Sequence, residues 1–202
     1  METSLNIGIT WNIYFQNLGS WLKTPMQAFS FLESEYFFLF LLLALSWCLE
    51  ARLGLRVGII LLLSTSVNDT LKMAFHGPYP YWISTDVIGY ADETSFGLPS
   101  GHAQIAVGVW GMLTASLCKM WAWLIAILII LMIGISHIYL GVHFPHEVIL
   151  GWLIGVILLW LVLQYWKLTA EWVNKLSLGQ QIFGAFKHLS YFFSFPSSHI
   201  HG

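Results

Sequence analysis

Hydrophobic residues are gathered into five long runs, separated by short polar breaks and by one long connection over residues 76–100. A helix needs about 20 mostly apolar residues to cross a membrane, and each run approaches that length. The first run carries Glu33 and Glu35, so we expect its start to be interfacial and its apolar core to cover residues 36–49. The pattern predicts an all-α protein, an integral membrane helical bundle of five or six transmembrane helices. The five expected spans are residues 29–49, 57–75, 101–118, 121–142 and 148–166.

The two ends of the chain lack such runs. Polar Asn12, Gln16 and Asn17 interrupt the aromatic stretch over residues 7–22, which favours a helix lying in the interface over one crossing it. We expect no cleavable signal peptide, because no basic leader with a compact apolar block follows the first residue. The expected divisions are an N-terminal interfacial segment (1–28), a transmembrane domain (29–166) and a cytoplasmic or amphipathic tail (167–202).

Basic residues in the connections predict the orientation of the bundle. Lysine and arginine favour the cytoplasmic side of a membrane. Alternating spans put most of them on one side, with Lys23 as the exception. The loop over residues 76–100, which has no Lys or Arg, and the turn at 143–147 then share the extracytoplasmic face. The residues on the cytoplasmic side are Arg52, Arg56, Lys119, Lys167 and Lys175.

Composition excludes two broad classes of protein. Hydrophobic residues make up 57% of the 202 and charged ones 9%, far below the roughly 25% charged of an ordinary soluble domain. A net charge of −2 offers no basic face for nucleic acid. The two cysteines, Cys48 and Cys118, lie in or beside apolar runs and predict no disulfide framework.

The first of three polar clusters lies at the outer end of the second expected span. Lys72 stands inside an apolar segment, where a charge is expensive and by default marks a functional site. Tyr79 and Pro80 follow it. The alternative interpretation is that Lys72 extends its amine to the surface or pairs with Asp69.

The second cluster, PSGH, leads directly into the third expected span. Ser100 can cap that helix, and Gly101 lets a ligand approach the free N–H groups at its start, so an anion site is expected there. His102 follows. The alternative is an ordinary helix cap with a solvated histidine beside it.

The third cluster joins the last two spans. His143 and Glu147 are four residues apart, so the carboxylate can accept the ring N–H and leave the other ring nitrogen free as a nucleophile. Ser136 and His137 precede them. The alternative is a polar turn at the lipid interface. Because the topology brings all three clusters to one face, together they predict a phosphate-transfer site.

The order and spacing of these residues resemble the type 2 phosphatidic acid phosphatase superfamily, which shares its core with vanadium haloperoxidases. That family has KxxxxxxRP, then PSGH, then SRxxxxxHxxxD. Lys72 and Pro80 match the first motif, and PSGH is unchanged at residues 99–102. Ser136 and His143 match the third. The flanks at residues 80–82 and 143–146 resemble the glucose-6-phosphatase branch and related bacterial enzymes, and the resemblance covers residues 57 to about 166.

Three charged positions of the family pattern differ here. Tyr79 and His137 stand where the family has arginines, and Glu147 stands where it has aspartate. A carboxylate survives at Glu147. Neither tyrosine nor histidine reproduces the bidentate phosphate contact of arginine. The sequence therefore does not decide whether the protein is a competent enzyme.

The resemblance implies a phosphohistidine mechanism without cofactor or metal. His143 would be the nucleophile, Glu147 would orient it, and His102 would protonate the leaving oxygen. The expected substrate is a phosphate monoester or pyrophosphate, with a lipid as the favoured class, in contact with membrane lipids. If His137 replaces arginine as a cation, activity should have an acidic optimum. The residues expected to bind the phosphate are Lys72, Tyr79, Ser100, Gly101 and His137.

Three alternatives stay open. The chain could be a catalytically impaired member that binds an anionic lipid headgroup without turnover, because two arginines are missing. It could act on a soluble sugar phosphate, as its flanks suggest. A metal site made of His137, His143, His146 and Glu147 is a third alternative, disfavoured because HxxHE lacks the HExxH spacing.

Overall fold

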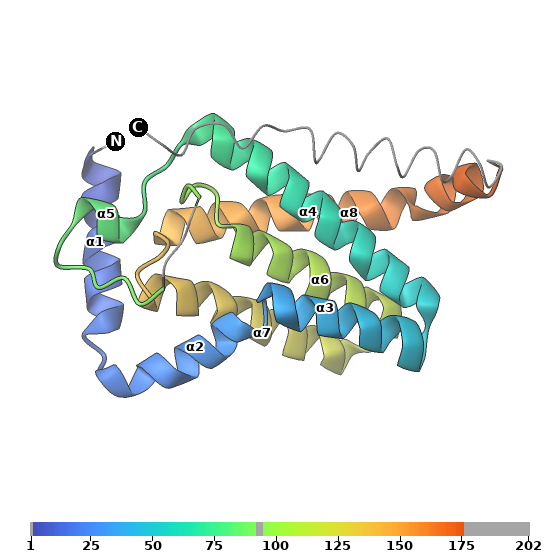
Figure 1. Ribbon diagram of the computed structural model, residues 1–202, viewed down its shortest axis with the longest axis horizontal. Helices are drawn as coiled ribbons and strands as arrows, with labels where there is room; N and C mark the ends of the chain where they lie inside the picture. The colour runs from blue at the N-terminus through green and yellow to red at the C-terminus, as the bar shows by residue number, and fades with distance from the viewer. Residues whose placement is uncertain (1, 92–94, 176–202) are drawn as a thin grey trace. The chain divides into compact units, whose positions relative to one another are not determined.

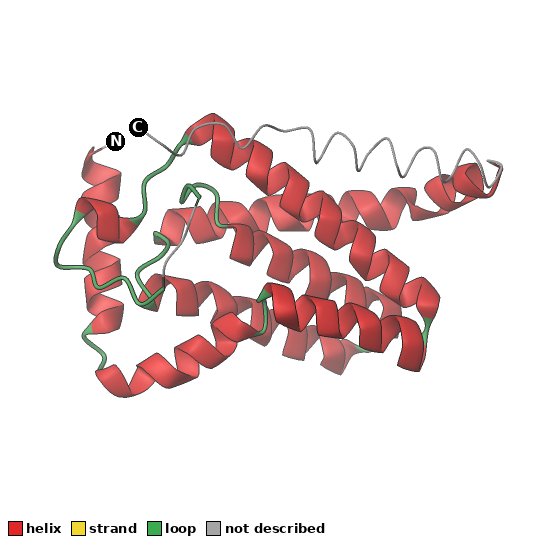
Figure 2. Cartoon of the chain, viewed as in Figure 1, coloured by secondary structure: helices red, strands yellow, loops and turns green. Residues whose placement is uncertain are grey.

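The computed structural model describes residues 2–91 and 95–175, and these fold into helices joined by turns and by one longer connection between residues 83 and 101 (Figures 1 and 2). The chain forms two compact units, Met1–Leu161 and Val162–Gly202. The candidate site residues discussed below belong to the first unit. The described part of the second unit is the C-terminal portion of the last helix. The helices are α1 (Glu2–Gln16), η1 (Ser20–Leu22), α2 (Lys23–Phe31), α3 (Glu35–Ala44), η2 (Leu45–Leu49), α4 (Ala51–Phe75), α5 (Pro80–Ile83), α6 (Gly101–Leu117), α7 (Met120–Tyr139) and α8 (Pro145–Lys175).

Within the described part of the chain, three helical segments are long and apolar enough to cross a membrane: Ala51–Ile83, Met120–Tyr139 and Pro145–Trp166. A fourth arises if Ser20–Phe31 and Tyr36–Cys48, which are bent by 47°, form one span. Large apolar side chains point outward from these helices, as lipid-facing residues do; Leu62, Leu128 and Leu153 are examples. The prediction of an all-α membrane bundle is confirmed, while the number of spans stays a prediction, since α6 has only 17 residues.

Local sequence explains where the helices end. α4 stops at His76, which adopts the left-handed conformation with φ of 50°. α7 ends just before Gly141, whose φ of 76° suits glycine, and α8 begins at Pro145, a residue favoured at the first helical position. α8 therefore starts three residues earlier than the span expected from residue 148, and it continues past residue 166 to Lys175.

The chain ends were expected to be an interfacial segment and a tail. Residues 2–16 form α1, which runs across the direction of the long helices in Figure 1. Its location in the membrane interface stays a prediction. Most of the tail, residues 176–202, lies outside the described residues.

Candidate active site

One end of the bundle brings the three polar clusters together. α4 and α7 finish there, and α6 and α8 begin there (Figure 1). The backbone links the clusters directly, because the N–H of Ser100 donates to the carbonyl of Glu147 at 3.2 Å. The PSGH segment and the start of α8 are thus one structural unit.

His143 and Glu147 form a buried pair. Nδ1 of His143 lies 3.0 Å from Oε2 of Glu147, and the two residues are 0% and 2% exposed. The same oxygen accepts the backbone N–H of Phe144 at 3.1 Å. A carboxylate can only accept, so Nδ1 carries the proton and Nε2 of His143 keeps its lone pair. Burial lowers the pKa of His143 well below its usual value, which keeps the ring neutral.

His102 faces this free nitrogen. Its Nδ1 lies 3.4 Å from Nε2 of His143, and the two rings meet edge to face. α6 holds His102 in place because the Ser100 hydroxyl accepts the N–H of Ala103 and caps the helix at its first turn. The His102 side chain is 24% exposed, so it is the more accessible of the two histidines.

Lys72 and Tyr79 both contact the hydroxyl of Ser95. Nζ of Lys72 donates to the Ser95 hydroxyl at 2.8 Å, and the Tyr79 hydroxyl lies 3.2 Å from the same oxygen. Tyr79 also donates to the carbonyl of Phe96 at 3.1 Å, and its ring centroid is 5.8 Å from that of His143. Tyr79 therefore shares Ser95 with the lysine and packs beside the nucleophile, although it brings no charge of its own.

His137 lies on the other side of His102. The two rings stack with centroids 4.2 Å apart and planes 20° apart. Nδ1 of His137 donates to the carbonyl of Ile133 at 2.8 Å, which leaves Nε2 toward the Ser30 hydroxyl at 3.4 Å. The sequence predicted that His137 binds phosphate as a cation. In the structure its ring is surrounded by protein groups and the residue is 2% exposed.

Glu33 is a site residue that was not predicted. It lies between α2 and α3, at the bend where Ser34 caps α3 by accepting the N–H of Phe37. Its Oε1 is 3.0 Å from Nε2 of His102 and 3.7 Å from Nε2 of His137. The sequence did carry a signal, a carboxylate within an apolar run, but that pattern is equally typical of an interfacial helix start.

Three described residues have possible metal-ligand atoms within 4.8 Å of one another. They are Glu33, His102 and His137. The lone pair of an imidazole nitrogen lies in its ring plane, so two nearly parallel stacked rings do not direct both lone pairs at one ion. The set considered from the sequence, and disfavoured there, shares only His137 with this one, and its His146 ring stacks on Phe144. Neither set is arranged as a good metal site.

Buried amides hold the site together from α1, α4 and α6. Asn12 donates to the carbonyls of Ile138 at 2.8 Å and His143 at 3.0 Å, and is fully buried. Asn68 donates to the carbonyl of Pro99 and to Oε1 of Gln104. A buried amide is stabilising only when it is hydrogen-bonded, so these contacts fix the loops on both sides of the histidines.

Two glycines are required by close approach. A Cβ on Gly101 would lie 2.7 Å from Oδ1 of Asn68, and one on Gly97 would lie 2.9 Å from Oε1 of Glu147. Both distances are shorter than van der Waals contact. The chain can pass this close to the amide and the carboxylate only because side chains are absent there.

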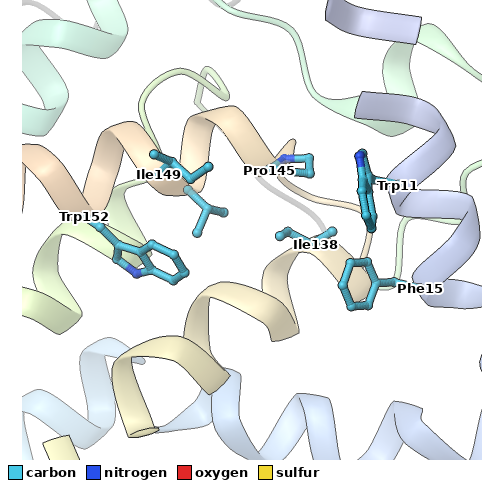
Figure 3. A pocket seen from close by; sticks show the side chains of 7 residues that line it. Trp11, Phe15, Ile138, Pro145, Ile149 and Trp152 are labelled. Atoms are coloured by element: carbon cyan, nitrogen blue, oxygen red, sulfur yellow. The ribbon is translucent and has the colours of Figure 1, made fainter. Parts of the chain in front are cut away.

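An apolar cavity of about 380 Å³ lies beside the site, between α1, α7 and α8 (Figure 3). Ile138 and Pro145 connect it in sequence to His137 and His143. The picture shows the Trp11 and Trp152 rings at opposite ends of the cavity. Its remaining lining residues are Phe15, Val148 and Ile149.

Comparison with known proteins decides the family. The model of the PAP2 superfamily matches residues 53–172. The chain belongs to the PAP2 superfamily. The resemblance stated from the three motifs is therefore confirmed, and this PAP2 protein carries the histidine pair on the family's helical core.

Individual relatives agree with this membership. Glucose-6-phosphatase 3 of Bos taurus is 29% identical over 80% of this chain and 54% of its own length. The chain thus spans about half the length of the curated relatives it matches. Among solved structures, LpxE of Aquifex aeolicus has a TM-score of 0.69 with 27% identity, covering 79% of this chain and 96% of LpxE. A transmembrane phosphatidylglycerolphosphate phosphatase from Bacillus subtilis has a TM-score of 0.64 with 25% identity, covering 77% and 84%.

Proposed function

We propose that this PAP2 protein is a membrane phosphatase that hydrolyses a phosphate monoester or pyrophosphate of a lipid through a phosphohistidine on His143. The observation that carries the proposal is the buried His143–Glu147 pair, with Nε2 of His143 directed at His102 across 3.4 Å. A neutral histidine oriented by a carboxylate is a competent nucleophile.

The chemistry has two steps. Nε2 of His143 attacks phosphorus, the bond from phosphorus to the leaving oxygen breaks, and that oxygen takes a proton from His102. Water then attacks the phosphohistidine and gives its proton to His102, releasing inorganic phosphate and free His143. Lys72, Ser100 and the N–H of Gly101 would hold the phosphate oxygens, in the way that helix N-termini and lysine bind anions.

The missing arginines lower the expected affinity for phosphate. Each charged hydrogen-bonding contact is worth about 1.5–3 kcal/mol. Tyr79 and His137 provide no permanent charge, so Lys72 carries most of the attraction to the phosphate. The intact histidine pair still favours an enzyme over a headgroup-binding protein without turnover.

A lipid substrate fits the surroundings of the site better than a soluble sugar phosphate does. The cavity beside Ile138 and Pro145 is lined by apolar side chains and is large enough to receive part of an acyl or isoprenoid chain (Figure 3). We place the site on the extracytoplasmic face, because the loop over residues 76–100 has no basic residue.

The test is phosphate release by the full chain in detergent. We expect the wild type to release phosphate from lipid phosphates and to form an acid-labile phosphoprotein. His143→Ala should lose at least about a hundredfold in activity, because a nucleophile is removed, and should form no phosphoprotein. His146→Ala is the matched control, since its ring stacks on Phe144 outside the pair.

Three results would count against the proposal. Binding of lipid phosphates without any turnover would favour the impaired member of the family. Turnover of sugar phosphates alone would exclude the lipid substrate. Turnover that survives in His143→Ala would exclude the phosphohistidine.

A further inference from the structure

Glu33 faces His102 from the side opposite His143. Its carboxylate lies 3.0 Å from Nε2 of His102, and its side chain is only 3% exposed. Oε2 has no hydrogen-bond partner among the described residues. Burying an ionisable group with one oxygen unsatisfied costs stability, so packing alone does not account for Glu33.

The four side chains form a continuous row. Glu147 contacts Nδ1 of His143 at 3.0 Å, Nε2 of His143 faces Nδ1 of His102 at 3.4 Å, and Nε2 of His102 contacts Glu33 at 3.0 Å. Each histidine therefore has a carboxylate on its outer nitrogen. The inner nitrogens face each other, where a phosphoryl group must react.

Proton counting gives the two histidines different states. Nε2 of His143 is a lone pair, so the 3.4 Å contact is a hydrogen bond only if Nδ1 of His102 carries a proton. The contact with Glu33 then needs one more proton, shared between Nε2 of His102 and the carboxylate. All three contacts of the row are hydrogen bonds when His102 and Glu33 together hold this extra proton.

We propose that Glu33 is a positioning residue for the general acid, orienting His102 and favouring its protonated form as Glu147 orients the nucleophile. This inference rests on the proposed function. When the bond from phosphorus to the leaving oxygen breaks, its electron pair stays on the oxygen, which takes the Nδ1 proton of His102. Nε2–H remains hydrogen-bonded to Glu33, and Nδ1 accepts a proton from water in the second step.

The consequence is a dependence on the leaving group. An alkoxide leaves slowly without a proton, whereas 4-nitrophenolate leaves without help. Loss of general acid catalysis lowers the rate about 10²–10⁴-fold. This loss of rate should be confined to the substrate with the poor leaving group. A defect in folding or in phosphate binding would slow both substrates alike.

The experiment compares an alkyl phosphate lipid with 4-nitrophenyl phosphate in the full chain. We expect Glu33→Gln to lower kcat/KM, which reports the step in which the leaving group departs, by about 30-fold or more on the alkyl phosphate, within the range for general acid catalysis. On the aryl phosphate kcat/KM should change less than threefold. His102→Ala should show the same selectivity, and the double variant should be no worse than His102→Ala alone, because the residues act as a unit.

Glu50→Gln is the matched control, because Glu50 is exposed and its side chain makes no cap hydrogen bond. Glu33→Asp keeps the charge and should recover part of the alkyl activity. If Glu33→Gln does not fold, a Glu33→Asp variant with equal loss on both substrates overturns the inference.

The outcomes separate the two proposals. Equal loss on both substrates in Glu33→Gln, with an active wild type, overturns the role of Glu33 and leaves the phosphatase intact. A wild type inactive on both overturns the proposed function itself. Loss of wild-type activity with 1,10-phenanthroline, restored by zinc, would assign Glu33, His102 and His137 to a metal and overturn the inference.

Discussion

At the scale of single residues, His143 and His102 need opposite protonation states, and their surroundings differ in the required direction. His143 is 0% exposed and donates to Glu147, whereas the His102 side chain is 24% exposed. Burial disfavours a charged ring, so His143 is the neutral partner. The more accessible ring is the one that must gain and lose a proton in each turnover.

This difference predicts the pH dependence. Because burial lowers the pKa of His143 well below its usual value, the nucleophile stays unprotonated as pH falls through about 6.5, the unperturbed value. The acid limb of kcat/KM should therefore lie below pH 6.5. Profiles from pH 4.5 to 8 with two substrates whose phosphates ionise at different pH separate this limb from that of the substrate. An acid limb centred at 6.5 for both substrates would mean that His143 titrates as a solvated histidine.

At the scale of helices, α1 braces the active-site turn. Asn12 reaches from α1 to the carbonyls of Ile138 and His143, and Gln16 donates to the carbonyls of Ile88 and Tyr139. α1 thus ties the end of α7 to the turn that carries the nucleophile. The contacts of Asn12, and that of Gln16 with Tyr139, join residues more than 100 positions apart in the chain.

We expect Asn12→Ala to destabilise the protein and to lower phosphate release. It removes a donor from the carbonyls of Ile138 and His143. The Ile138 carbonyl keeps the N–H of Gly141, so the main cost is the loss at His143, where a buried polar group left unsatisfied costs about 1–3 kcal/mol. The measurement is thermal unfolding in detergent together with kcat. Asn6→Ala on the same helix is the control, because Asn6 is exposed. Equal effects of the two substitutions would rule out the bracing role of Asn12.

The sequence was informative where chemistry depends on neighbours in the chain. His143 and Glu147 are four residues apart, and Ser100 directly precedes the helix that it caps, so their local arrangement followed from spacing. Asn12 and Glu33 were noticed only as polar breaks, because their partners lie on α6, α7 and the turn before α8. No local pattern encodes such distant contacts. The bend between α2 and α3 was likewise not predicted, because it falls within an apolar run.

At the scale of the whole bundle, the proposed chemistry and the proposed orientation are independent claims. The site lies where α6 begins, and Cys118 lies where α6 ends, about 25 Å away at 1.5 Å per residue over 17 residues. The exposed residue Asp86 belongs to the loop on the side of the site. Labelling at these two positions therefore reports which face carries the site.

We expect an impermeant maleimide to label Asp86→Cys in intact cells when Cys48→Ser and Cys118→Ser remove the native thiols. A Cys48→Ser variant that keeps Cys118, which is exposed, should be labelled only after permeabilisation. The reason is the charge distribution, since Lys119 adjoins Cys118 while residues 76–100 carry no basic side chain. The reverse labelling pattern would turn the site toward the cytoplasm. It would leave the histidine geometry untouched, but the phosphate ester would then have to be supplied from the cytoplasmic leaflet.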